Sequence, residues 1–245
     1  RALMDGYLPV LRTWWQHGPI FYEQTTFLDK LDGDLSAVRL DDPTVLFVRV
    51  RVVNTSADEA GRAGLCFRTL EDRRSQSSER LYVVGDRILA DYTGQPRLRL
   101  LCDTAGRGEL NNDGDAVRWS LALAPGESHQ FHLTVPSVTL ADQADIDALR
   151  RRDFDADRKR VAAYWKTLTD RGMRITTPEP WIDDFFKAHV RHLLVNCYKE
   201  LDSDRLHAHV GTFIYGVYPN ESCMMISDLD RRGYTDGARR CLDAF

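Results

Sequence analysis

The residues best suited to chemistry lie in the sequence FIYGVYPNE, which runs from Phe213 to Glu221. Glu221 is expected in the first turn of a helix, after a loop that carries Phe213, Tyr215 and Tyr218. Aromatic rings commonly stack on pyranose faces, and the carboxylate of Glu221 would point toward this aromatic loop. An acidic residue in a first helical turn is also favoured by the helix dipole alone. Tyr215, Tyr218 and Glu221 are therefore candidate ligand-binding residues, with simple helix termination as the alternative.

The other acidic side chains in this half of the chain have weaker support as functional-site residues. Asp228 follows Glu221 by seven positions, which places both carboxylates on one face of a helix and makes Asp228 a candidate for the same site. Asp183 and Asp184 fall in the expected first turn of another helix, where the dipole accounts for them. No spacing singles out a catalytic pair, and we assign none.

The spacing of the histidines and cysteines gives little support for a metal site or for disulfide bonds. The chain has no HExxH motif, and His207 and His209, which are two apart, are interpreted as part of a solvated loop. We predict no structural metal and no cofactor. The odd number of cysteines and the lack of a CxxC pair predict buried free thiols rather than a disulfide framework; the five are Cys66, Cys102, Cys197, Cys223 and Cys241.

The composition limits the classes of partner. Hydrophobic residues make up 43% of the 245 residues, enough for a packed core. The net charge of -4 arises from 33 basic and 37 acidic residues that are mixed throughout, which argues against nucleic acid as a partner. No apolar run approaches the roughly 20 residues that cross a bilayer, so we expect no membrane partner. The first residues lack a signal-peptide layout, both ends look like cuts in a longer polypeptide, and localisation is left open.

The first 140 residues predict an antiparallel β-sandwich. The segment 44–54, TVLFVRVRVVN, alternates between one apolar face and one partly polar face. Turn sequences around Gly114 and Gly126 suit hairpins. Trp14 and Trp15 are adjacent on a strand and should point to opposite faces, one of them into the core. Further strands are expected at 7–15, 20–28, 63–70, 81–84, 87–92, 97–102, 116–123 and 128–135.

The pattern becomes helical after residue 140. A connecting helix is expected from Asp142 to Gly172, which would end it, and the segment MRITTPEP then suggests an extended lead-in strand. A further helix follows Pro180, with apolar residues at intervals of three and four that include Phe185. Another is capped by Asn220 and stops at Gly233. The last begins near residue 235, and its apolar stripe is Ala238, Cys241, Leu242 and Phe245.

The predicted organisation is a sandwich at 1–140, a helical linker and lead-in strand at 141–178, and an incomplete helical domain at 179–245. Helices of this length are marginal in isolation, so their apolar faces require partners. We expect part of that partner to lie outside this chain.

The helical half resembles the entry into the catalytic domain of α/α-toroid glycoside hydrolases, namely glucoamylases, α-L-rhamnosidases and glycogen-debranching-like enzymes. The resemblance rests on the Tyr164-Trp165 pair, on ITTPEP, on WIDDFFKAHVRHLLVNCY, and on the passage from Gly211 to Phe245. In the last of these the Leu-Asp-x-x-Gly turn and the Ala-Arg-x-x-Leu helix appear as Leu229, Asp230, Gly233, Ala238, Arg239 and Leu242. The first half is similar to the supersandwich that precedes the toroid, mainly in order and size.

The resemblance implies a (α/α)6 barrel, a six-hairpin glycosidase fold that is truncated here, and a carbohydrate substrate. Where the family has an arginine-aspartate pair that holds the terminal sugar, this chain has Asn220 and Glu221, and Tyr218 stands before the proline. The catalytic acid and base of such enzymes come from later helices, beyond this chain. The sugar itself is not carried over.

The leading hypothesis is that this is the N-terminal part of a bacterial glycoside hydrolase that removes a terminal sugar. One alternative is an inverting disaccharide phosphorylase, in which phosphate replaces the attacking water. Another is a non-catalytic glycan-binding or structural protein in which Asn220 and Glu221 only begin a helix. The expected partners are a carbohydrate and the missing remainder of the toroid.

Overall fold

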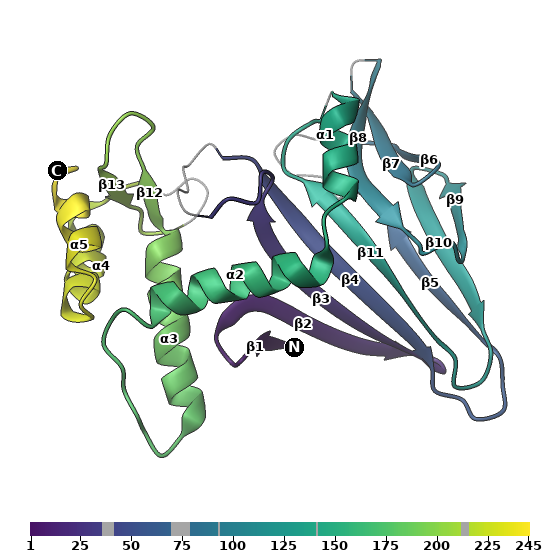
Figure 1. The fold of residues 1–245 in the computed structure, drawn as a ribbon, viewed down its shortest axis with the longest axis horizontal. Coiled ribbons are helices and arrows are strands. Elements are labelled where there is room, and N and C mark those ends of the chain that lie inside the picture. The colour runs from purple at the N-terminus through teal and green to yellow at the C-terminus, as the bar shows by residue number, and fades with distance from the viewer. Residues whose placement is uncertain (36–41, 70–78, 93, 141, 212–215) are drawn as a thin grey trace. The chain divides into compact units, whose positions relative to one another are not determined.

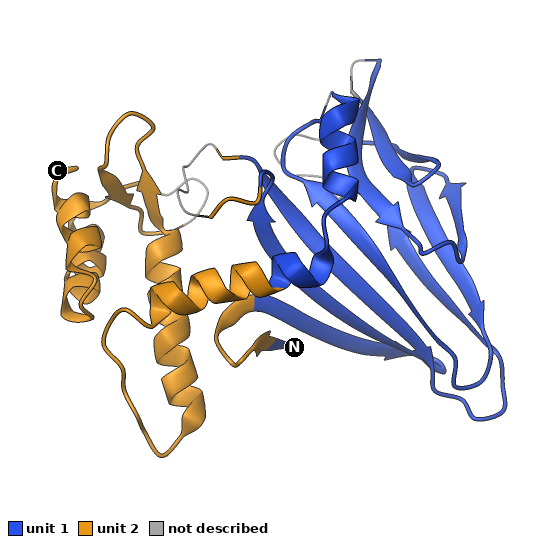
Figure 2. Cartoon of the chain, in the orientation of Figure 1, with its two compact units in different colours: residues 1–2, 10–32, 43–158 blue, residues 3–9, 33–42, 159–245 orange. Residues whose placement is uncertain are grey.

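The computed structural model describes residues 1–35, 42–69, 79–92, 94–140, 142–211 and 216–245. An antiparallel β-sandwich is followed by α-helices, which confirms the fold class expected from the sequence (Figure 1). The chain divides into two compact units (Figure 2). Unit 1 comprises residues 1–2, 10–32 and 43–158, and unit 2 comprises residues 3–9, 33–42 and 159–245. The domain boundaries near residues 140 and 178 stay predictions.

The larger sheet of the sandwich has eight strands in the order β1-β2-β3-β4-β11-β8-β7-β6. Strands β2 to β4, β11, β8, β7 and β6 pair antiparallel with their neighbours. Their bounds are β1 Ala2–Met4, β2 Leu8–His17, β3 Ile20–Lys30, β4 Thr44–Asn54, β6 Leu81–Val84, β7 Arg87–Tyr92, β8 Gln95–Asp103 and β11 Ser128–Pro136.

The smaller sheet has three strands in the order β5-β10-β9, with bounds β5 Gly61–Phe67, β10 Ala116–Leu123 and β9 Glu109–Asp113. All nine strands expected in the sandwich are present within a few residues, although the expected end of one at residue 70 lies outside the described residues. Strands β1 and β9 were not expected. The sequence of β9, ELNND, has none of the β-branched or aromatic residues that mark a strand, and it is paired only through β10.

The core of unit 1 lies between the two sheets. Trp119 of β10 is fully buried and packs on Phe131 of β11, with ring centroids 4.4 Å apart. Alternation in β4 sends Val48, Val50 and Val52 into this core, while its other face carries the buried Phe47 and partly polar neighbours, as the sequence predicted.

The adjacent tryptophans of β2 confirm the expected division between faces. Trp15 packs against the core and stacks on Tyr22 with ring centroids 4.9 Å apart, whereas Trp14 is 47% exposed. Alternation along a strand accounts for this difference between neighbours of identical chemistry.

The two glycine turns differ from each other. Gly114, at φ 62°, joins β9 to β10 within the smaller sheet and confirms a hairpin. Gly126, at φ 68°, joins β10 to β11, which belong to different sheets. The expectation of a hairpin at Gly126 is therefore wrong: the same turn chemistry lets the chain cross from one layer of the sandwich to the other.

Two helices, α1 (Gln143–Arg150) and α2 (Phe154–Thr169), replace the single connecting helix expected after residue 142. The break comes at Arg152, whose guanidinium donates to the carbonyls of Lys30 at 2.6 Å and Leu31 at 3.0 Å. Asp153 then caps α2 by accepting from the Ala156 N–H at 2.7 Å. A tertiary contact and a new cap thus override a periodicity that continues across the break.

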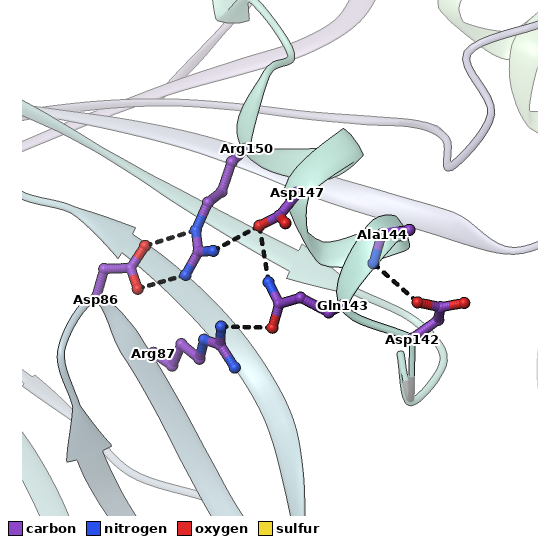
Figure 3. Close-up of polar contacts among 7 residues, drawn as sticks. All are labelled: Asp86, Arg87, Asp142, Gln143, Ala144, Asp147 and Arg150. Atoms are coloured by element: carbon purple, nitrogen blue, oxygen red, sulfur yellow. Dashed lines mark hydrogen bonds and ion pairs between the residues drawn. The ribbon is translucent and has the colours of Figure 1, made fainter.

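Both ends of α1 are bound to β7 and to the turn before it by polar side chains (Figure 3). Arg150 donates to both carboxylate oxygens of Asp86, at 2.7 and 2.9 Å, and to Asp147 at 2.9 Å. Gln143 accepts from Arg87 at 2.8 Å and donates to Asp147 at 2.7 Å. These contacts hold α1 beside the outer face of the larger sheet.

Unit 2 contains α3 (Pro180–Val195), a hairpin of β12 (Cys197–Lys199) and β13 (Leu206–Ala208), α4 (Pro219–Arg231) and α5 (Thr235–Leu242). Its main apolar cluster consists of Leu193, Ala208, Ile226, Leu229, Ala238 and Cys241. A second cluster joins the N-terminal segment to α2 and α3 and consists of Tyr7, Leu8, Ala162 and Ala188. No helix in the described ranges is long and apolar enough to span a bilayer.

The end of α4 is the best-defined turn of unit 2. The Tyr234 N–H donates to the Leu229 carbonyl and the Gly233 N–H to the Asp230 carbonyl, both at 2.9 Å, with Gly233 at φ 85°. This is a Schellman motif, and it confirms the predicted helix end at Gly233. Tyr234 also donates through its hydroxyl to the carbonyls of Leu168 at 2.9 Å and Thr169 at 3.1 Å.

Gly172 does not end a helix, as the sequence predicted, but allows a close contact with another segment. Helix α2 already ends at Thr169, and a Cβ at Gly172 would lie 2.4 Å from both the Arg232 carbonyl oxygen and the Tyr234 ring. The glycine is required by this close approach, not by a left-handed conformation. The expected lead-in strand is also wrong, because MRITTPEP forms no strand; its first N–H, from Met173, donates to the Arg232 carbonyl at 2.7 Å.

Several side chains expected on apolar stripes are exposed. Phe185 of α3 and Leu242 and Phe245 at the end of the chain are exposed, whereas Ala238 and Cys241 are buried as expected. All five cysteines are free thiols, but Cys66 and Cys223 are exposed instead of buried. Burial raises the pKa of the Cys102 thiol to about 12, which keeps it protonated and unreactive.

Replacing Trp119 by Ala should destabilise unit 1 by about 3–5 kcal/mol, because it removes the largest fully buried side chain of the sandwich. Trp14→Ala, at an exposed position on the neighbouring sheet, is the matched control and should cost less than about 1 kcal/mol. Urea unfolding followed by circular dichroism measures both. Equal losses for the two variants would contradict the assigned core.

Gly233→Ala should destabilise α4 and α5 by about 1–2 kcal/mol, because a side chain must then adopt a left-handed conformation. Gly237→Ala, inside α5 with nothing within 4 Å of the new Cβ, should instead be neutral or stabilising by up to about 1 kcal/mol. Thermal unfolding of the two variants gives the comparison. A neutral Gly233→Ala would rule out the Schellman turn.

Candidate functional site

Three of the residues singled out from the sequence come together at the start of α4. Tyr218 is the N-cap at φ -111° and ψ 118°, Pro219 occupies the first turn, and Glu221 is the acidic residue of that turn. Tyr218 is 50% exposed, and Asn220 and Glu221 are exposed beside it. Asn220 is not the N-cap that the sequence suggested. Proline fixes its own φ and lacks an N–H, so Pro219 starts the helix and moves Asn220 inside it.

The side chains of this turn are available for a ligand. Among the described residues, Tyr218, Asn220 and Glu221 accept or donate no side-chain hydrogen bond, and no side chain caps the helix. The N–H groups of Asn220 and Glu221, which have no partner within the helix, lie at the same helix end as a phenol, an amide and a carboxylate. Tyr215, the fourth predicted residue, lies outside the described residues.

A buried hydrogen bond to β13 holds the first turn of α4 in place. Ser222 is fully buried, and its hydroxyl donates to the Ala208 carbonyl of β13 at 2.6 Å. Its N–H donates to the Tyr218 carbonyl at 2.8 Å. The turn that carries the candidate residues thus rests on a buried hydrogen bond, which gives their backbone a fixed position.

Asp228 lies two turns further along α4 and is occupied by other groups. Its carboxylate accepts from Arg232 at 2.9 Å and lies 3.5 Å from Nδ1 of His189 on α3. Arg232 also donates to the Phe186 carbonyl at 3.1 Å and stacks over the Phe186 ring at 4.0 Å. Asp228 therefore joins α3 to α4, and its role at a sugar site stays a prediction.

The hairpin of β12 and β13 is not among the elements expected from the sequence, and it has two different faces. Cys197 pairs with Ala208 and Lys199 with Leu206, and Cys197, Leu206 and Ala208 pack against the main cluster of unit 2. The pair of Tyr198 and His207 lies on the opposite face. That face borders an open hollow of about 730 Å³, lined by Tyr198, Lys199, Glu200, Leu201, Asp202, His207 and His209.

Two polar pairs define this hollow. His207 Nε2 lies 2.7 Å from Glu200 Oε1, and the His209 ring stands edge-on to Tyr198 with centroids 4.5 Å apart. The Ser203 hydroxyl, which donates to the other Glu200 oxygen, and His207 hold the pKa of the Glu200 carboxyl below its usual range. Nowhere in the described residues do three His, Cys, Asp or Glu side chains gather to hold a metal ion.

The signal for this hairpin was present in the sequence. Tyr198 and Glu200 are two apart, His207 and His209 are two apart, and the LDSD turn sequence separates them. Strands of only three residues do not stand out against a loop, which is why the two histidines were interpreted as a solvated loop.

No family model matches the chain, and no curated protein matches it. Among solved structures, the chain is similar to a family GH92 alpha-mannosidase from Bacteroides thetaiotaomicron, with 12% sequence identity and a TM-score of 0.33. The similarity covers 80% of this chain and 30% of that chain, so the present chain spans about 30% of the length of that protein.

Replacing Ser203 by Ala should raise the pKa of Glu200 toward its ordinary range, because the largest stabilisation of the carboxylate is lost. A carboxyl with a lowered pKa stabilises the fold above its unfolded-state pKa, and this contribution disappears as the pH falls through the folded-state value. Carbon-13 NMR of the glutamate carboxyls over pH measures the change. The internal control is Glu127, whose pKa is lowered by the Ala124 N–H and Arg107 and should stay so. An unchanged Glu200 titration would contradict the assigned contact.

Proposed function

We propose that the chain is the N-terminal part of a carbohydrate-active enzyme, a glycoside hydrolase that removes a terminal sugar. The observation that carries this proposal is the start of α4, where Tyr218, Asn220 and Glu221 are exposed together on a turn fixed by the buried Ser222. The order of an antiparallel sandwich followed by amphipathic helices supports it. So does the Leu229-Asp230-x-x-Gly233 sequence, which forms the turn expected from the resemblance.

In this proposal the first turn of α4 holds hydroxyl groups of the sugar. The carboxylate of Glu221 accepts hydrogen bonds from neighbouring hydroxyls, the Asn220 amide both donates and accepts, and Tyr218 offers its ring face. Tyr215 completes the aromatic side of the site, and Asp228 contributes from the next turns if its contact with Arg232 opens. None of these groups is a catalytic acid or base.

The remainder of an α/α toroid is proposed to pack against unit 2. Large apolar side chains are exposed on its helices and at the last residue, and covering them would stabilise the assembly by roughly 25 cal/mol for each Å² removed from water. They are Trp181, Phe185, Val195, Met224, Leu242 and Phe245. The acid and base carboxyl groups that glycoside hydrolysis needs are proposed to come from those further helices.

Two alternatives predict different behaviour of the whole protein. A disaccharide phosphorylase would cleave its substrate only with phosphate, whereas a hydrolase turns over in its absence. A non-catalytic glycan-binding protein would bind sugar at α4 and cleave nothing. Turnover of a panel of disaccharides with and without phosphate therefore separates the three.

Glu221→Ala should weaken the binding of the recognised monosaccharide by about tenfold or more, because a hydrogen bond to a charged group contributes roughly 1.5–3 kcal/mol. Calorimetric titration of monosaccharides into the protein measures this. Asp230→Ala removes an exposed carboxylate from the other end of α4 and should leave the affinity unchanged. Equal affinities of the wild-type protein and Glu221→Ala for every sugar would remove Glu221 from the site.

A further inference from the structure

Unit 1 has a cavity of its own on the outer face of the larger sheet. Its volume is about 640 Å³, and it lies where α1 meets α2, above strands β4, β8 and β11. Helix α1 contributes Leu149 and Arg150, and the start of α2 contributes Phe154 and Asp155. The volume is within the usual range for small-molecule sites, which is roughly 300–1,000 Å³.

The floor of this sandwich cavity is a polar stripe on β11. Gln130, His132 and Thr134 alternate with Phe131 and Leu133, which point into the core between the sheets. A polar stripe on a sheet face that helices cover is unusual, because such faces are normally apolar. Packing alone does not explain it.

The cations around the cavity are already neutralised by carboxylates. Arg150 is paired with Asp86 through two hydrogen bonds, as Figure 3 shows, and Arg49 donates to both oxygens of Asp155 at 3.1 and 3.2 Å. Arg152 is bonded to Asp157 at 2.8 Å and also to Asp29. Asp103 and Asp153 line the cavity as well, so its carboxylates outnumber its guanidinium groups, which disfavours an anion such as phosphate as the ligand.

The groups of the floor are left available. Among the described residues, the side chains of Gln130, His132 and Thr134 have no hydrogen-bond partner. Burial, with Arg49 beside it, lowers the pKa of His132, so its ring is neutral near pH 7 and carries one donor and one acceptor. On the same face His132 pairs with Arg49 of β4 and with Asp103 of β8. Asp153, which caps α2, and Asp155 within α2 complete its charged surroundings.

An amide, a neutral imidazole and a hydroxyl each offer both a donor and an acceptor, which is also the property of a sugar hydroxyl. Apolar atoms of Phe47, Leu101, Leu110 and Phe154 border the same space and suit the C–H faces of a pyranose ring. We propose that the sandwich cavity binds a neutral monosaccharide or the terminal sugar of an oligosaccharide, at a site separate from α4. This site is independent of the role proposed for the first turn of α4.

The test is an NMR titration of the whole chain with D-glucose, D-mannose, D-galactose and L-rhamnose, and separately with inorganic phosphate. At least one sugar should shift the His132 ring signals in a saturable manner at millimolar concentration; a His132→Gln variant assigns those signals. Thr134→Val and Gln130→Ala should each weaken this binding by about threefold to tenfold. Thr13→Val, on β2 and outside the cavity, is the matched control and should change nothing.

The outcomes are distinct. Absence of a saturable shift with every sugar up to about 50 mM would overturn the proposal and leave a cavity that holds water only. A shift with phosphate alone would overturn the neutral ligand. Equal affinity in the folded Thr134→Val and Gln130→Ala variants would place the ligand elsewhere. Glu221→Ala should leave the His132 shifts unchanged, so a failure of the α4 site and a failure of the sandwich cavity are told apart.

Discussion

The contacts of Arg152 fix the connection between α1 and α2 to the end of β3, and the position of both helices on the sandwich depends on this connection. Its guanidinium reaches the buried carboxylates of Asp29 and Asp157 and the carbonyls of Lys30 and Leu31 at the end of β3. A buried ion pair of this kind contributes modestly as a whole, but the loss of one partner leaves an uncompensated charge and costs roughly 3–5 kcal/mol. Loss of the Arg152 contacts would therefore disturb three features at once. These are the end of β3, the break between α1 and α2, and one wall of the sandwich cavity.

The two faces of the larger sheet show how one strand serves two purposes. On β11 the odd-numbered residues Phe131 and Leu133 build the core, and the even-numbered His132 and Thr134 line a polar cavity. The core side needs close packing, whereas the outer side needs hydrogen-bonding groups held at fixed spacing. The extended strand supplies that spacing, and the ion pairs of Arg49, Arg150 and Arg152 border the outer side.

Much of the fold could be predicted because its signals are local. The alternation in β4 and the positive-φ glycines at 114 and 233 are decided by residues adjacent in sequence. The break at Arg152 and the need for glycine at 172 were not predictable, because each depends on residues far along the chain, Asp29 in one case and Tyr234 in the other. Strand β9 was not predictable for the same reason, because its pairing with β10, and not its composition, makes it a strand.

The candidate site also has one part that local sequence predicts and another part that depends on distant residues. The first turn of α4 follows from Pro219 and the residues after it, so Tyr218, Asn220 and Glu221 were expected near one another. The partners of Asp228 come from α3 and from the end of α4, and no periodicity within α4 indicates His189. The sandwich cavity needs three strands and two helices in register, which a single sequence does not reveal.

The alternation of the β12–β13 hairpin has a consequence for how this region can change. Cys197, Leu206 and Ala208 pack in the main cluster of unit 2, and Tyr198 and His207, which alternate with them, border the open hollow on the other face. Tyr198, Glu200, His207 and His209 can thus be exchanged for other chemistries while the helices beneath keep the same apolar support. The hairpin is a surface whose recognition properties can diverge at little risk to folding.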